Sequence, residues 1–314
     1  MKNILTITLL LLALSTFKSQ QIGITSQYLL NDFSINPAVA GTKSYSPLSI
    51  SFRRQWTGID EAPVTQNLMY HTSLGESAGF GGQVFNDASG PSRRTGFNTT
   101  FAYNIKTSKE TNLSFGLSGS LTQFSINRDR LITEIPNDIA ISNLNNSLIA
   151  DCNFGIYWSG VRHFVGFSAY NLFENKTDIT ALTKPITNTL NRVFYTYGGY
   201  NFKIGAIIEI QPSMIIRIMN NDLIQFDGNL KLTVKNTYSL AISYRNKDAV
   251  AFIGGINIGT TTVGYSYDLG VSKMKTYSSG SHEIFLCYKL KKDNKSKTPW
   301  KNRNRVYSSN SLEN

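Results

Sequence analysis

The sequence has few of the residues on which most enzymes and disulfide-rich secreted proteins depend. It contains 2 cysteines and 3 histidines in 314 residues. Two cysteines do not make a disulfide framework in a chain of this size, and we expect both to be free thiols. No histidine has a metal-ligand spacing to another histidine, a cysteine or an acid, and we find no phosphate loop, nucleophile elbow or zinc motif. We therefore expect no enzyme activity, cofactor or bound metal.

Long apolar runs are also scarce. The run from Ile4 to Leu14 follows Lys2 and ends in polar residues, which is typical of a secretory signal peptide, and we predict that residues 1–19 are one. No other stretch approaches the 18 apolar residues of a spanning helix, which excludes a helical membrane protein. Proline is rare at 8 residues, against 18 Phe, 16 Tyr and 24 Gly, and this composition favours β-structure.

Charge is unevenly distributed along the chain. The net charge is +11, and eight of the lysines and arginines lie between Lys289 and Arg305, against the single acid Asp293. An exported protein rarely meets nucleic acid, so we expect no nucleic-acid partner for this run. We interpret residues 292–314 as a basic periplasmic tail, which is either solvated or in contact with an acidic partner.

Alternation of apolar and polar residues is the dominant pattern of the chain. From Thr237 to Arg245, tyrosine, leucine and isoleucine alternate with threonine, serine, alanine and arginine. This period of two residues predicts β-strands. About fourteen such segments follow one another, each near the ten residues that a tilted membrane strand needs. They are residues 47–56, 63–72, 77–86, 94–106, 110–127, 147–158, 161–171, 191–203, 207–218, 222–234, 237–246, 249–258, 261–269 and 281–291.

The charged residues separate a membrane barrel from a soluble sandwich. Those within strands fall on the polar face, and a basic residue on a lipid face would cost roughly 2–4 kcal/mol at mid-membrane. The set is Asp151, Arg162, Glu209, Arg217, Asp227, Lys231, Arg245, Glu283 and Lys289. Connections after even-numbered segments are tight and several after odd-numbered ones are long, as in outer-membrane barrels. We predict an all-β fold, a transmembrane antiparallel β-barrel of about 14 strands over residues 47–291, in the outer membrane of a Gram-negative bacterium with both termini periplasmic.

Two residues depart from this pattern. Arg54 falls on the apolar face beside Trp56, and we place it at a rim, where the cost of a charge is small. Pro212 lies inside a strand and predicts a bulge or a local break.

Short blocks along the chain match the sequence pattern of a known family. The first block is Gln27–Tyr28, Asn31, Ile35–Asn36–Pro37–Ala38 and Ala40–Gly41. The second is Arg54–Gln55–Trp56–Thr57–Gly58–Ile59 followed by Ala62–Pro63–Val64–Thr65, in which Asp60–Glu61 departs from the family pattern. Further matches are Gly82, Val84, Asn86–Asp87, Gly90–Pro91, Tyr265–Ser266–Tyr267–Asp268 and Gly280–Ser281–His282–Glu283–Ile284.

Together these blocks resemble the PorP/SprF family of the type IX protein secretion and gliding machinery. The resemblance implies a barrel, embedded in outer-membrane lipid, that supports the export or surface attachment of large adhesin-like proteins used in gliding. Implied partners are the C-terminal domain of the secreted adhesin and the periplasmic secretion-ring proteins. From the residues themselves, we predict that residues 20–46 are a periplasmic N-terminal segment, with a short helix over Ser26–Phe33 and a turn-rich plug over Ile35–Gly41 at the periplasmic mouth. The alternative for this segment is an ordinary leader strand. The candidate partner-contact or plug residues are Asn36, Pro37, Ala38, Gly41, Arg54, Gln55, Trp56, Gly58 and Pro63.

Two other functions stay open on the sequence. A barrel of this size has room for a lumen, so an outer-membrane channel for small solutes is the alternative. An outer-membrane hydrolase would use His282, Glu283 and Asp268, but adjacent strand residues such as His282 and Glu283 point to opposite faces.

Overall fold

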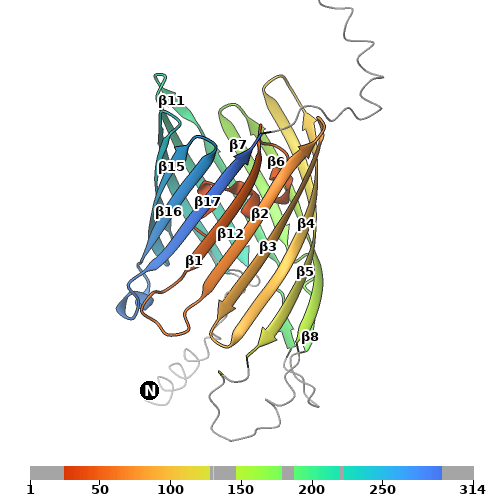
Figure 1. Cartoon of the computed structure of the whole chain (residues 1–314), viewed down its shortest axis with the longest axis vertical. Helices are drawn as coiled ribbons and strands as arrows, with labels where there is room; N and C mark the ends of the chain where they lie inside the picture. Colours follow the sequence, from red (N-terminus) through yellow and green to blue (C-terminus); the bar gives the residue numbers. More distant parts are fainter. Residues whose placement is uncertain (1–24, 128–129, 131–145, 179–186, 220–222, 292–314) are drawn as a thin grey trace, which may run out of the picture.

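The computed structural model describes residues 25–127, 130, 146–178, 187–219 and 223–291. These residues form a closed antiparallel barrel (Figure 1). The sheet has 15 strands, of which the short β11 continues the line of β10, so that fourteen strands surround the lumen. The predicted fold class is therefore confirmed. Within the described residues, no helix is long and apolar enough to cross a membrane.

The barrel strands follow one another round the sheet, and closure comes from the pairing of the first strand with the last. The bounds are β1 Ser46–Arg54, β2 Val64–Leu74, β3 Ala78–Ser89, β4 Ser92–Lys106, β5 Thr111–Ile126, β6 Ser147–Gly160, β7 His163–Tyr170, β10 Val193–Tyr200, β11 Phe202–Ile204, β12 Ile208–Met219, β13 Leu223–Val234, β14 Tyr238–Arg245, β15 Ala249–Ile258, β16 Thr261–Gly270 and β17 Ser281–Leu290. Two further strands, β8 Lys176–Asp178 and β9 Thr187–Thr189, form a separate two-stranded sheet.

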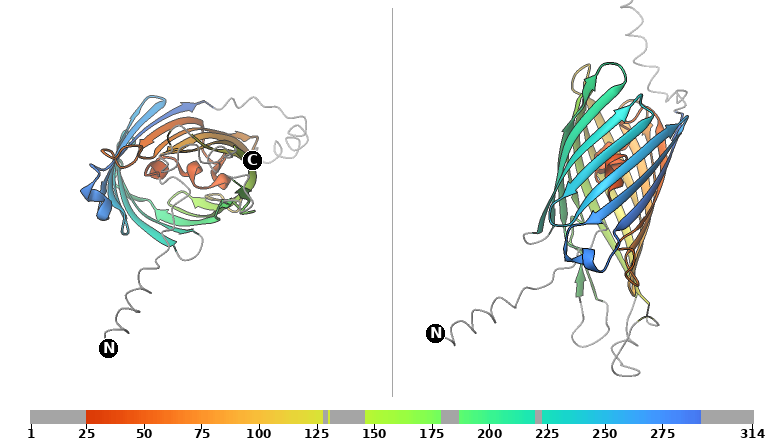
Figure 2. Two further views of the ribbon diagram at one scale, coloured as in Figure 1. Left: turned by 90° about the horizontal axis from the view of Figure 1, so that it is seen from below. Right: turned by 90° about the vertical axis from the view of Figure 1, so that its left-hand side faces the viewer.

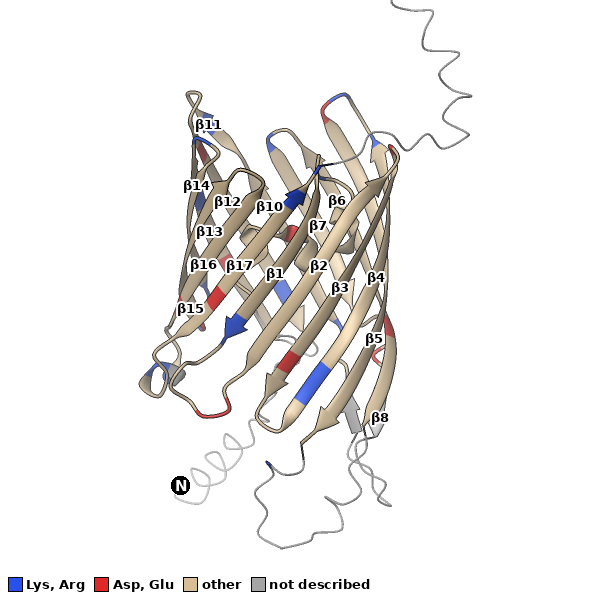
Figure 3. Ribbon diagram, in the orientation of Figure 1, with Lys and Arg blue, Asp and Glu red and all other residues tan. Residues whose placement is uncertain are grey.

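The two faces of the strands have inverted polarity compared with a soluble protein. On β1, Leu48, Ile50 and Phe52 are exposed, whereas the serines between them are buried. On β5, Leu117 is 57% exposed and its neighbour Ser118 only 3%. Most charged residues lie towards the two ends of the barrel (Figure 3). An apolar outer face and a polar interior are the arrangement that a lipid bilayer requires.

The two rims of the barrel differ. At one, here called the short-turn rim, β2–β3, β6–β7, β13–β14 and β15–β16 are joined by tight turns. Left-handed residues such as Gly75 and Gly259 make two of these turns. The opposite rim, here called the long-loop rim, carries the connections 55–63 and 271–280, although β3 and β4 are joined there by Gly90–Pro91 alone.

The departure at Pro212 is a local break. β12 runs through Pro212 without interruption, and the break lies in its partner, between the end of β10 at Tyr200 and the start of β11 at Phe202. Proline has no N–H to donate, and the ladder on the β10–β11 side of β12 is interrupted opposite Pro212, whereas the ladder to β13 continues through it.

Residues 25–45, here called the lumen segment, lie inside the barrel (Figure 2). They form three 3₁₀ turns, η1 Gln27–Leu29, η2 Asp32–Ser34 and η3 Pro37–Val39. The predicted helix over Ser26–Phe33 is wrong. Asn31 has φ −141° and ψ 88°, outside the helical region, and its side chain donates to Ser49 of β1 instead of serving a helix.

Candidate functional site

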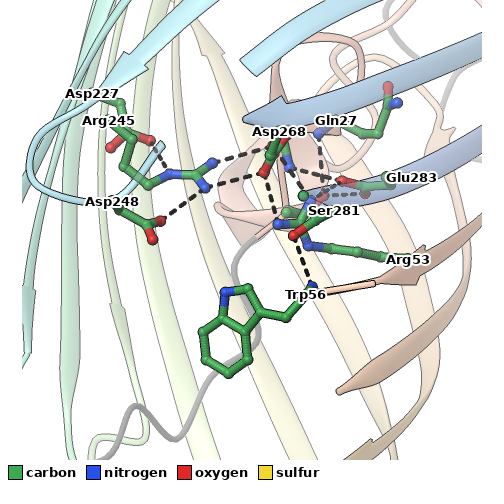
Figure 4. A network of polar contacts seen from close by, with 12 residues as sticks. Gln27, Arg53, Trp56, Asp227, Arg245, Asp248, Asp268, Ser281 and Glu283 are labelled. Atoms are coloured by element: carbon green, nitrogen blue, oxygen red, sulfur yellow. Dashed lines mark hydrogen bonds and ion pairs between the residues drawn. The ribbon is translucent and has the colours of Figure 1, made fainter. Parts of the chain in front are cut away.

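Buried charges gather inside the barrel near the long-loop rim, in a set here called the ion cluster (Figure 4). Its members are Arg53, Asp227, Arg245, Asp248, Asp268 and Glu283. Arg53 lies 2.7 Å from Asp268 and 3.2 Å from Glu283. Arg245 lies 3.4 Å from Asp227 and 3.3 Å from Asp268. Apart from Asp248, these side chains are at most 4% exposed, so each charge depends on its partners for compensation.

The lumen segment begins inside this ion cluster. The Ser26 hydroxyl donates to Asp268 at 2.8 Å and accepts from Arg245 at 3.2 Å. The backbone N–H of Ser26 donates to Glu283 at 2.9 Å, and the Tyr28 hydroxyl donates to Asn229 at 3.0 Å. Hydrogen bonds to ionised groups are stronger than neutral ones, so the cluster anchors this end of the segment.

Glycines of the barrel make room for the rest of the lumen segment. A Cβ added at Gly116 of β5 would lie 2.3 Å from the backbone nitrogen of Ala38. One added at Gly155 of β6 would lie 2.0 Å from Asn36 Oδ1, and one at Gly79 of β3 would lie 2.1 Å from the carbonyl oxygen of Ala40. Only glycine allows so close an approach of backbone to backbone. The inward-facing glycines therefore fix where the segment crosses the lumen.

Asn36 joins the lumen segment to the barrel. Its side-chain oxygen accepts from the N–H of Ala38 at 2.8 Å and caps η3. Its amide nitrogen donates to the carbonyl of Ile156 on β6 at 2.9 Å. Pro37 takes the first position of the turn, where its missing N–H costs nothing. Asn36 and Ala38 are fully buried, as are the two residues that follow Ala38.

An ion pair holds the segment on the short-turn side. Lys43 lies 3.1 Å from Asp32. Burial acts to raise the pKa of the Asp32 carboxyl, but attraction to Lys43 and their hydrogen bond outweigh it and hold that pKa below its ordinary value. The same attraction raises the pKa of Lys43 against the effect of its burial. Gly41, with φ +76°, then turns the chain, and its N–H donates to His71 at 3.2 Å.

The candidate residues of the second block lie apart from those of the first. Arg54 ends β1 and is exposed. The backbone N–H of Gln55 donates to the carbonyl of Pro63 across the 55–63 loop at 2.9 Å. Trp56 has φ +50°, and its backbone N–H donates to the Ser281 hydroxyl at 3.1 Å. This loop, with Gly58 at φ +99°, therefore lies at the long-loop rim beside the ion cluster. Asn36, Pro37, Ala38 and Gly41 lie within the lumen, so the nine residues form two sites.

Strand alternation places Arg245 and Glu283 on the polar, inward face, but it does not predict the ion cluster. The cluster draws its side chains from β1, β17, β16, β14 and β13 and from the β14–β15 connection, with β15 lying between β14 and β16. Strand alternation does not reveal this order or its register. The sequence carried one signal of this cluster. Glu283 falls on an inward face, and a buried carboxylate is costly unless a basic residue pairs with it, as Arg53 of the first strand does. Within the described residues, no three His, Cys, Asp or Glu side chains are placed to hold a metal ion. Cys152 and Cys287 are free thiols.

A closed antiparallel barrel with an apolar outer face and a polar lumen defines the class of this protein as an outer-membrane β-barrel. The chain belongs to the PorP/SprF family of type IX secretion system membrane proteins, whose family model matches residues 17–288.

Solved structures give more distant likenesses. The chain is similar to the CymD monoaromatic hydrocarbon channel at 10% identity and a TM-score of 0.49, covering 88% of this chain and 95% of that chain. It is similar to the Pseudomonas putida toluene transporter TodX at 9% identity and a TM-score of 0.46, covering 87% and 95%. It is similar to the Acinetobacter baumannii outer membrane protein Omp33 at 9% identity and a TM-score of 0.43, covering 80% of this chain and 100% of that chain. At these values the likenesses carry no functional conclusion. No curated protein sequence matches.

Proposed function

We propose that this protein is a non-enzymatic scaffold of the type IX secretion machinery that supports the export or surface attachment of a large adhesin-like protein used in gliding. The observation that carries the proposal is the lumen segment, anchored by the ion cluster and fitted against inward glycines. A segment fixed across the lumen is a disadvantage for an open pore. It suits a barrel whose rims bind other proteins.

The proposed orientation places the short-turn rim in the periplasm, as is usual for outer-membrane barrels. β1 then begins and β17 ends on the periplasmic side, and the 55–63 loop faces the cell exterior. The secreted adhesin's C-terminal domain contacts this loop, with Arg54 and Trp56 as the exposed and aromatic contacts. Periplasmic secretion-ring proteins contact the opposite rim and the basic tail 292–314.

Comparison of the surface and secreted proteomes of cells with and without the gene tests the proposal. We expect one large surface protein to be lost, and its return on expression of the wild-type gene. A Trp56→Ala variant that keeps the heat-modifiable gel mobility of a folded barrel should lose the same protein. Truncation after residue 291 should reduce recovery of the periplasmic partners. An unchanged proteome in a strain without paralogous genes contradicts the proposal.

The alternative, a channel for small solutes, is favoured by the space left on each side of the lumen segment. Cavities of about 140 Å³ and about 230 Å³ lie on its two sides. Planar-bilayer conductance distinguishes the two functions, because a scaffold should show closed-state current only. Steady conductance by the wild-type protein would favour the channel.

A further inference from the structure

The cavity between the lumen segment and the long-loop rim has the dimensions of a small-molecule site. Its volume is about 140 Å³, and residues of the lumen segment, including Gln27 and Asn31, form part of its lining. That volume holds about ten ordered water molecules and is comparable to a sugar ring with about a dozen non-hydrogen atoms. It is too small for a folded domain or a long peptide.

A row of side-chain amides crosses one wall of this cavity. Asn98 of β4 donates to Gln83 of β3 at 3.1 Å, and Gln83 donates to Asn67 of β2 at 2.9 Å. Asn67 in turn donates to Ser51 of β1 at 3.3 Å. Each amide has two N–H donors and two lone pairs, so the row keeps free donors and acceptors after these bonds are made. Such a surface matches hydroxyl groups, which both donate and accept.

The charges next to the row are paired, whereas Arg217, which also lines the cavity, has no acid partner among the described residues; it donates to Gln225 at 2.6 Å and lies over the Tyr195 ring. Arg94 lies 2.6 Å from Asp87, which also accepts from Thr65 at 2.8 Å. Arg53 is paired with Asp268 and Glu283. An anionic or cationic ligand would have to compete with these pairs, whereas a neutral polar ligand would not.

Aromatic rings and an unpartnered amide complete the lining. Tyr170, Tyr195 and Phe85 line the cavity, and the Arg217 guanidinium lies 5.3 Å from the centre of the Tyr195 ring. Gln27 is only 2% exposed, yet its amide oxygen and nitrogen make no hydrogen bond to any described residue. A Cβ added at Gly264 would lie 3.2 Å from the side-chain oxygen of Gln27, so this amide lies against β16 and is separate from the amide row.

We propose that this cavity binds one ring of a neutral saccharide. The hydroxyls bond to the amide row, and the aromatic side chains cover the apolar edge of the ring. The site is separate from the rim surfaces of the proposed secretion role and does not depend on that role.

The test is ligand binding by the full-length folded protein in lauryl dimethylamine oxide micelles, which contain no sugar. Saturation-transfer NMR with glucose, galactose and N-acetylglucosamine as probes should give signals that saturate. Gln83→Leu, which interrupts the amide row, should weaken binding by about tenfold, since it removes several hydrogen bonds. Gln211→Leu is the matched control, because Gln211 lines the cavity on the other side of the lumen segment, and its binding should equal wild type.

Several results would overturn the proposal. They are absence of saturable binding of all three sugars, equal binding by Gln83→Leu and wild type, and binding of glutamate or inorganic phosphate in preference to the sugars. Gln83→Glu keeps the size of the side chain and loses its donors, so it replaces the leucine variant if that variant does not fold. The proteome comparison reports on the secretion role separately.

Discussion

Gly116→Ala should displace the lumen segment. The added Cβ would lie 2.3 Å from the nitrogen and 2.6 Å from the Cα of Ala38, where ordinary contact begins at 3.4 Å. The obstacle is backbone, which cannot rotate away, so the segment must move by about 1 Å or the strand must bend. Overpacking of this kind costs about 1–3 kcal/mol.

That cost sets the expected size of the effect. Each 1.4 kcal/mol is a factor of ten in population, so the displaced state of the segment should become about 5–150 times more populated. Trypsin cleavage after Lys43, followed by mass spectrometry, should accelerate by a similar factor, because cleavage tracks the open population when opening is fast. The folded barrel itself should keep its heat-modifiable gel mobility.

Gly119→Ala is the matched control on the same strand. A Cβ at Gly119 meets nothing within 4 Å, so this variant should behave as wild type. Equal cleavage rates for Gly116→Ala and Gly119→Ala would refute the role of the inward glycines in holding the lumen segment.

Three further predictions concern charge. Arg53→Met should lower the free energy of unfolding in lipid vesicles by about 3–5 kcal/mol, because buried acids lose their partner. Arg54→Met on the outer face should change it by less than about 1 kcal/mol. Urea titration measures both free energies, and equal effects would contradict the buried ion cluster. Because the pKa of Asp32 is held below its ordinary value near 3.8, its ion pair stabilises the lumen segment above that pH and is lost as pH falls through the lowered pKa. Hydrogen exchange of the segment, corrected for intrinsic rates, should therefore accelerate in acid in wild type and be largely independent of pH in Asp32→Asn. Leu117→Arg on the outer face should cost about 2–4 kcal/mol in vesicles and Val161→Arg at the short-turn rim about 0–1 kcal/mol, and equal costs would contradict a bilayer around β5.

The barrel could be predicted because each strand carries its own evidence. The alternation on β5, with Leu117 outward and Ser118 inward, needs no knowledge of neighbouring strands. The charge at Arg54 was tolerable only near a rim, and the structure ends β1 at that residue. These are local consequences of a lipid face, so one sequence is enough to read them.

The lumen segment was harder to predict because its structure is set by contacts distant in sequence. Asn31 leaves helical geometry to bond to Ser49. The position of Asn36 is set by its hydrogen bond to the carbonyl of Ile156, 120 residues further along the chain. Nothing local in residues 25–45 distinguishes a periplasmic leader from a segment inside the barrel. The positions of the inward glycines can be read from the sequence, but the residues of the lumen segment that pack against them cannot.

The order of the chain gives the ion cluster a consequence for assembly. Arg53 belongs to the first strand, whereas Asp268 and Glu283 belong to the last two, and Ser26 lies between them. The bonds of Arg53 to Asp268 and Glu283 can form only when β1 meets β17, and Ser26 bonds to the same two acids. We therefore expect closure of the cylinder and enclosure of its N-terminal segment to occur together. A chain that closed without the segment would leave three buried acids and two arginines without Ser26 among them, and such a misassembled barrel should open again more readily than a correct one.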